Sequence, residues 1–95
     1  MSTEHEIEVE KQARECWIPD YMIGGLVRYV VHHIEPGDFL CAVIANDLLG
    51  AYQCADRTNS DKLYNYVQFF YRHAPPQCWG SREALKAWLA KREEH

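Results

Sequence analysis

The sequence predicts an all-α protein that folds as a compact bundle of four or five short helices. Apolar residues recur three and four positions apart along most of the chain, which is the spacing that places them on one face of a helix. The breaks in this spacing fall at proline, at glycine and at clusters of Asp, Asn and Ser. No segment carries the alternation of apolar and polar residues that marks a half-buried strand. We therefore expect consecutive helices and no sheet.

The length and composition fit one small globular domain. The chain has 95 residues, of which 47% are hydrophobic and 25% are charged, and this balance is typical of a folded protein. The formal net charge is −4, whereas a protein that binds nucleic acid usually carries a basic patch. Nucleic acid is therefore not an expected partner. Because no apolar run is long enough to span a bilayer and no secretion signal follows Met1, we expect a cytoplasmic protein without membrane contact.

Residues 1–17 differ from the rest of the chain. The segment is polar, and Val9, Ala13 and Cys16 contribute to only a narrow apolar stripe. A helix of this kind is marginal when isolated, so the segment is either a docked helix or a frayed arm. We divide the chain into this polar N-terminal helix or arm, residues 1–17, and a single helical domain, residues 18–95.

The second helix is expected to begin near Pro19 and to end before Pro36, which cannot extend a helical hydrogen-bond ladder. Two glycines, Gly24 and Gly25, fall in its interior, where each costs about 1 kcal/mol relative to alanine. We favour close packing of a crossing helix as the reason, and exposure of the backbone to a ligand is the alternative. The predicted buried stripe of this helix consists of Ile23, Leu26, Val27, Val30 and Ile34.

A third helix is predicted from Pro36 or Asp38 to Ala55, with Leu48 on its buried face. Asp47 is in register with that face, and a buried carboxylate needs a partner because an unpaired buried charge is costly. Arg28 is one candidate for that partner. Two of the four cysteines, Cys41 and Cys54, fall within this helix and are expected to be small core residues.

The next helix, at about residues 60–73, is strongly aromatic. Thr58, Asn59 or Ser60 is expected to cap it. It is apolar over more than half of its circumference, so it is either central in the fold or shared between a core face and a partner face. Its aromatic side chains also suit a contact between copies of the chain, so a homo-oligomer is one open alternative. A last amphipathic helix is predicted to begin after Ser81 as its cap.

The candidate residues for binding a ligand or a partner are Tyr21, Arg28, His32, Asn46 and Asp47. Arg28 and His32 are four residues apart and share a helix face, where together they could hold an anion. For His32 the alternative is a place in the last helical turn, where a cation complements the negative end of the helix. Asn46 and Asp47 form either a buried polar tie between helices or a contact with a polar ligand.

No motif in the chain names a reaction. No Ser-His-Asp or Cys-His set has a recognisable local signature, and Glu35 and Asp38 lie at a turn where capping explains them. The cysteines form no C-x-x-C pair, which structural zinc modules usually contain. We therefore expect no catalytic residue, no metal and no cofactor, and hence a protein that is not an enzyme.

Several stretches of the sequence resemble a family of short proteins encoded by tailed phages and prophages. They are "IPDYMIGGLVRY", "EPGDFLCAVIANDL", "AD" followed by Asn59, and "CWGS". The family pattern is I-P-x-Y-M-x-G-G-L-x-R-Y, then P-G-x-F-L-x-A-V, N-D-L and W-G-S, and it covers about residues 18–81 of this chain. The resemblance transfers no catalytic residue. It implies a phage accessory protein that acts inside a bacterium.

Three classes of function follow from these observations. The favoured one is a non-enzymatic phage accessory protein that binds and inhibits a host component, such as an anti-phage defence protein, and it predicts an exposed apolar or acidic patch. The second is an oligomeric sponge that sequesters a nucleotide-type immune signal in a pocket lined by Arg28, His32 and tyrosines. The third is a small helical hydrolase, which predicts a cavity holding a perturbed carboxylate or histidine. The expected partner is a host protein or a small anionic signal molecule.

Overall fold

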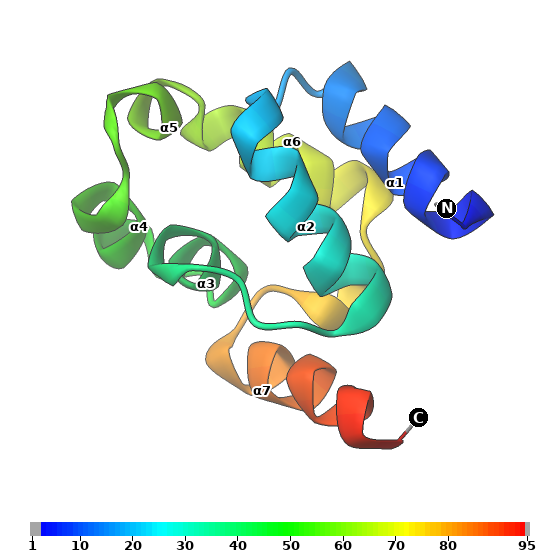
Figure 1. The fold of residues 1–95 in the computed structure, drawn as a ribbon. Coiled ribbons are helices and arrows are strands. Elements are labelled where there is room, and N and C mark those ends of the chain that lie inside the picture. The colour runs from blue at the N-terminus through cyan, green and yellow to red at the C-terminus, as the bar shows by residue number, and fades with distance from the viewer. Residues whose placement is uncertain (1–2, 95) are drawn as a thin grey trace.

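The computed structural model describes residues 3–94, and these residues fold as an all-helical protein measuring 34 × 27 × 20 Å. The all-α prediction is confirmed, whereas the described residues form seven α-helices in place of the four or five that were predicted. No strand occurs in the described part of the chain (Figure 1). In chain order the elements are α1 Glu4–Glu15, α2 Asp20–His32, α3 Asp38–Ile44, α4 Leu48–Cys54, α5 Arg57–Asp61, α6 Leu63–His73, the 3-10 helix η1 Pro76–Cys78, α7 Arg82–Ala90 and the 3-10 helix η2 Lys91–Glu94.

One additional helix arises from a break at Asn46. The predicted continuous helix to Ala55 was wrong, because the chain turns after Ile44 and starts again as α4. Asn46 has a φ of 61°, in the left-handed region that Asn tolerates better than most residues. Asp47 then caps α4, and its Oδ1 accepts a hydrogen bond from the backbone N–H of Gly50 at 2.9 Å.

A second additional helix precedes the aromatic helix. The cap of α5 is Asp56, whose Oδ1 accepts a hydrogen bond from the backbone N–H of Asn59 at 2.7 Å. Asn59, one of the predicted caps, is instead buried, and its Oδ1 accepts a hydrogen bond from the Tyr66 hydroxyl at 2.6 Å. The aromatic helix α6 therefore begins only at Leu63, and the predicted capping by residues 58–60 was wrong.

The N-terminal helix α1 lies along α2 and also contacts α6 (Figure 1). Val9 and Ala13 are buried in these contacts. The helix begins with a capping box, in which Thr3 and Glu6 each accept a hydrogen bond from the other's backbone N–H. From Thr3 onward this segment is thus a docked helix. The two predicted segments, 1–17 and 18–95, extend at residues 1–2 and 95 beyond the described residues.

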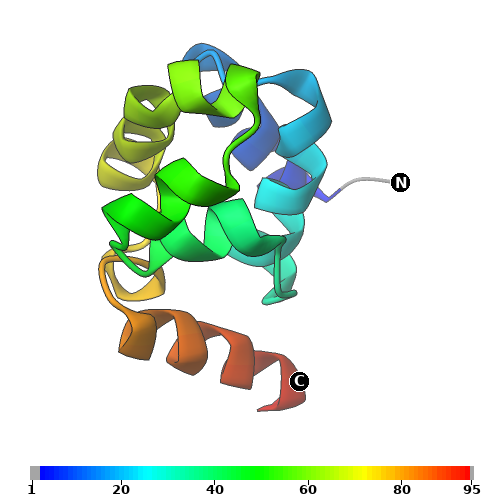
Figure 2. The same cartoon turned by 90° about the vertical axis from the view of Figure 1, so that its left-hand side faces the viewer.

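The C-terminal helix α7 lies below the other helices in both views (Figures 1 and 2) and is bonded to α2 through Tyr29. The hydroxyl of Tyr29 donates to the carbonyl of Cys78 at 2.7 Å, and the indole N–H of Trp88 donates to the carbonyl of Tyr29 at 2.8 Å. The His33 ring packs against the Trp88 ring, with 4.4 Å between their centroids. Ser81 caps α7 as predicted, since its hydroxyl accepts from the N–H of Ala84.

The buried cysteines are not the predicted ones. Cys16 and Cys78 are buried, whereas Cys54 is exposed and Cys41 is partly buried. Burial raises the pKa of the Cys78 thiol to about 12. The prediction for Cys54 was wrong because it assumed one helix through to Ala55, and the break at Asn46 changes the face that α4 turns inward.

Candidate functional site

Two of the five predicted site residues, Tyr21 and Arg28, line one hollow between α2 and the start of α3. We call it the Arg28 hollow, and its volume is about 270 Å³. Leu40 is buried and forms part of an apolar wall, whereas Arg28 and Glu35 are exposed. The lining residues are Tyr21, Met22, Gly25, Arg28, Glu35, Pro36, Gly37 and Leu40.

The two glycines of α2 leave room for the guanidinium of Arg28. A Cβ atom added to Gly24 would lie 3.1 Å from Nη1 of Arg28, and its nearest neighbours all belong to that guanidinium. A Cβ added to Gly25 would lie 3.8 Å from Nη2 of Arg28 and 4.0 Å from Cδ1 of Leu40. The predicted close packing of a crossing helix was therefore wrong at Gly24. The arginine folds back by one turn over bare helix backbone.

The guanidinium of Arg28 forms no hydrogen bond or ion pair with any described residue, although Glu35 lines the same hollow. The ion pair of Arg28 with Asp47 that the sequence suggested is absent. Oδ2 of Asp47 instead lies 4.0 Å from Nη2 of Arg82. The donors of the Arg28 guanidinium are thus open to solvent. A carboxylate or phosphate can accept two parallel hydrogen bonds from such a group.

Tyr21 borders the Arg28 hollow and is fixed at its hydroxyl. That hydroxyl donates to Oδ2 of Asp56, the cap of α5, at 2.6 Å. The hydrogen bond holds the pKa of Tyr21 above and the pKa of Asp56 below their usual values. Because the side chain is still 61% exposed, Tyr21 offers a partner a positioned aromatic ring.

His32 lies in the last turn of α2 and is turned toward α1. Its Nε2 lies 3.2 Å from Oε2 of Glu6. The backbone N–H of Thr3 and the imidazole of His32 both stabilise the Glu6 carboxylate and lower its pKa to about 2. His32 does not line the Arg28 hollow, so the predicted anion patch of Arg28 with His32 does not form.

Asn46 and Asp47 lie at the turn between α3 and α4, away from the Arg28 hollow. Asn46 is exposed, and the Asp47 side chain is 44% exposed. The predicted buried polar tie was therefore wrong, because these residues end one helix and cap the next. Both border a small cleft between α4 and α6, whose walls include Leu48 and Val67.

Sequence reasoning missed half of an exposed apolar surface on α4 and α6, which we call the α4–α6 surface. The aromatic composition of α6 indicated a partner face, but the contribution of α4 depends on the break at Asn46. Leu48, predicted to be buried, is 71% exposed. No charged residue occurs in α4 or in residues 63–71. The large apolar side chains of this surface are 47–78% exposed and are Leu48, Leu49, Tyr52, Tyr64, Val67 and Tyr71.

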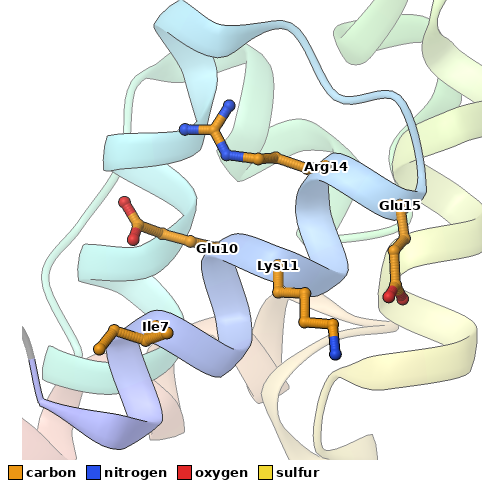
Figure 3. A pocket seen from close by; sticks show the side chains of 5 residues that line it. All are labelled: Ile7, Glu10, Lys11, Arg14 and Glu15. Carbon is orange, nitrogen blue, oxygen red and sulfur yellow. The ribbon is translucent and has the colours of Figure 1, made fainter.

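A hollow of about 450 Å³ on α1 does not make a binding site. Figure 3 shows that every residue lining it comes from α1 and that the side chains point to both sides of the helix. Arg14 is already bonded to Asp20, with 2.7 Å between Nη1 and Oδ1. Because all the lining residues belong to α1, the hollow has only one wall and lies on the surface of that helix.

Residues 3–94 contain neither a metal-binding cluster nor a membrane-spanning helix. In this part of the chain, no three His, Cys, Asp or Glu side chains come close enough together to hold a metal ion. None of the helices described there is both long and apolar enough to cross a membrane. Comparison with known proteins adds no assignment, since no family model, curated protein or solved structure matches the chain.

Proposed function

We propose that this chain is a non-enzymatic phage accessory protein that binds and inhibits a component of the bacterial host, such as an anti-phage defence protein in the cytoplasm. The contact that we assign to the host component is the Arg28 hollow. One observation carries the proposal: the guanidinium of Arg28 has no partner among the described residues and lies over the bare backbone of Gly24, beside an apolar wall. The phage setting comes from the resemblance in sequence.

The chemistry of the hollow favours a protein partner over a nucleotide. One cation, Arg28, is accompanied by one carboxylate, Glu35, so a multiply charged phosphate group meets repulsion as well as attraction. A protein surface can offer a carboxylate to Arg28, a cation to Glu35 and an apolar side chain to Leu40.

The carboxylates of the chain support binding rather than hydrolysis. A general acid or base works best when its pKa lies near the operating pH. Among the described residues, the two carboxylates with shifted pKa values, Glu6 and Asp56, are both shifted downward, by hydrogen bonds to their ionised forms. Neither is therefore suited to carry a proton at neutral pH.

The second candidate function is sequestration of a nucleotide-type immune signal by an oligomer of this chain. The open guanidinium of Arg28 is the observation that favours it, because arginine binds phosphate with two parallel hydrogen bonds. Glu35 in the same hollow and the absence of His32 from it count against this candidate.

The experiment is capture of the affinity-tagged full chain from an expressing bacterium, with mass spectrometry of retained proteins and small molecules. We expect one host protein to be retained by the wild type and reduced at least about tenfold by Arg28→Glu, which reverses the charge at the contact. Arg28→Lys keeps the charge but loses the bidentate geometry, so it should give an intermediate result. Lys86→Ala, which removes an exposed cation of α7, is the control and should capture as the wild type does.

The outcomes separate the two candidates. Equal capture of a host protein by the wild type and by Arg28→Glu contradicts a contact at the Arg28 hollow. A nucleotide retained without a host protein, and lost in Arg28→Glu, supports the second candidate instead. Retention of neither class contradicts both. The melting temperature of Arg28→Ala serves as the folding check and should stay unchanged, because no internal bond of Arg28 is lost.

A further inference from the structure

We propose that two copies of this chain form a symmetric dimer through the α4–α6 surface. This inference goes beyond the binding function assigned to the Arg28 hollow, and it concerns different residues. It rests on the area, the charge and the shape of the α4–α6 surface.

The exposed area is of the size that a stable dimer requires. Six large apolar side chains are exposed by 47–78%, which corresponds to roughly 700–800 Å² of surface when aromatic side chains span about 150–250 Å² each and the three aliphatic ones less. A standard protein interface buries about 800 Å² on each partner. The total accessible surface of the chain is 6115 Å², so these six side chains make up a large part of the surface that faces solvent. Monomeric proteins rarely expose an apolar patch larger than about 600 Å².

The charge distribution favours a second copy over a foreign partner. The chain has a formal net charge of −4, so two copies repel each other over most orientations. The α4–α6 surface contains no charged residue in α4 or in residues 63–71, and Asp47 at the border of its cleft is the one carboxylate in that lining, so two such faces can meet with few like charges opposite each other. Complementary charges add specificity for a foreign protein, and α4 and residues 63–71 offer none. Interfaces between identical subunits are the more apolar class.

The shape of the surface allows it to pair with itself. Tyr64 and Tyr71 are two helical turns apart on α6, on the side opposite the buried Tyr66 and Phe69. Both tyrosines are exposed, and Val67, which lies between them in sequence, lines the small cleft between α4 and α6. A two-fold axis sets this patch against the same patch of the partner, since one patch serves both sides of such an interface. Ridges packed into grooves are the usual geometry of helix contacts.

The test is sedimentation velocity of the purified full chain, at concentrations up to about 100 µM. We expect the wild type to sediment as a dimer, with twice the mass of one chain, which is 11.1 kDa. Leu48→Lys and Tyr71→Lys each place a charge in an apolar interface, and the two-fold axis adds the same charge from the partner protomer. Each should therefore raise the dissociation constant of the dimer at least about 100-fold. The matched control is Ile7→Lys, because Ile7 is 54% exposed on α1, outside this surface. All variants are checked for unchanged helix content by circular dichroism.

Three results would overturn the proposal. The first is a wild-type chain that stays monomeric at every concentration. The second is a dimer that both Leu48→Lys and Tyr71→Lys leave intact. The third is a monomer that captures a foreign protein through this surface and loses it in Tyr71→Lys. A dimer lost in both variants and kept in Ile7→Lys supports it. The first two results do not depend on Arg28, so they leave the capture experiment on the Arg28 hollow unaffected.

Discussion

Replacing either interior glycine of α2 with alanine is expected to stabilise the protein, although Gly25 lines the hollow that we assign to binding. Neither Gly24 nor Gly25 has a positive φ, and both lie within regular helix. The glycine pair is therefore not required by the backbone conformation. In a helix interior, glycine is less favourable than alanine by about 0.8–1 kcal/mol.

The surroundings of the two positions refine this magnitude. At Gly25 the added Cβ lies 3.8 and 4.0 Å from its neighbours, which is ordinary contact, so we expect the full gain of about 1 kcal/mol. At Gly24 the added Cβ lies 3.1 Å from Nη1 of Arg28, and the guanidinium must move by a few tenths of an ångström. That movement is at the free end of a flexible side chain, so at least about 0.5 kcal/mol of the gain should remain.

The assay is urea denaturation of the wild type, Gly24→Ala and Gly25→Ala, followed by circular dichroism. The midpoint should rise without a change in the slope m, since the surface exposed on unfolding is unaltered. Thermal melts should shift upward by about 4–8 °C for each kcal/mol gained. A loss of 1 kcal/mol or more in either variant would refute the reasoning, because it would mean that packed atoms other than the Arg28 guanidinium need the space above the glycines.

The same two variants test whether stability and binding diverge at this site. Gly24→Ala displaces the guanidinium, and Gly25→Ala adds a methyl group to the wall of the hollow. Both proteins should therefore be more stable than the wild type and yet capture less of the host protein. A stabilised variant that binds the host protein as well as the wild type would contradict a contact at the Arg28 hollow.

Three further predictions concern the tertiary structure. Asp47→Ala removes the cap of α4 and should lower the free energy of unfolding by about 1 kcal/mol in urea denaturation; no change would contradict the capping role. Tyr66→Phe leaves the buried amide oxygen of Asn59 without its donor, so it should cost about 1–3 kcal/mol by the same measurement, whereas a neutral effect would mean that this oxygen finds another partner. Glu6 has a folded-state pKa of about 2 against 4.5 in the unfolded chain, so its contribution is present above pH 4.5 and is lost as the pH falls to 2. The difference in stability between the wild type and Glu6→Gln should narrow over that interval, and a constant difference would contradict the hydrogen bonds assigned to its carboxylate.

The sequence was sufficient for the secondary-structure class but not for the division into helices. The apolar spacing along α2 and α7 is regular, and both helices form near their predicted positions. The break at Asn46 was missed because apolar residues on both sides of it keep a helical spacing. Its signal is local, since Asn tolerates a left-handed conformation and Asp47 is a favoured cap, and together they interrupt a helix that the apolar pattern alone would continue.

The candidate site was predictable only in part for a related reason. Tyr21 and Arg28 are close in sequence on one helix, so their proximity follows from helical geometry. The direction of each side chain depends on tertiary neighbours that a single sequence does not reveal. His32 turns to Glu6, 26 positions away on α1, and the surface around Leu48 exists only because α4 is a separate helix. Contacts of this kind are decided by packing rather than by local propensity.

The bonds around Tyr29 also have a consequence for the order in which this chain can fold. Its hydroxyl and its carbonyl are satisfied by residues 49 and 59 positions later, Cys78 and Trp88. A buried hydroxyl without a partner is costly, so the middle of α2 reaches its native environment only after the last quarter of the chain has arrived. Contacts between residues so distant in sequence slow folding and make it cooperative. During synthesis, α1 and α2 can therefore pair early, but the core around Tyr29 closes only when α7 docks.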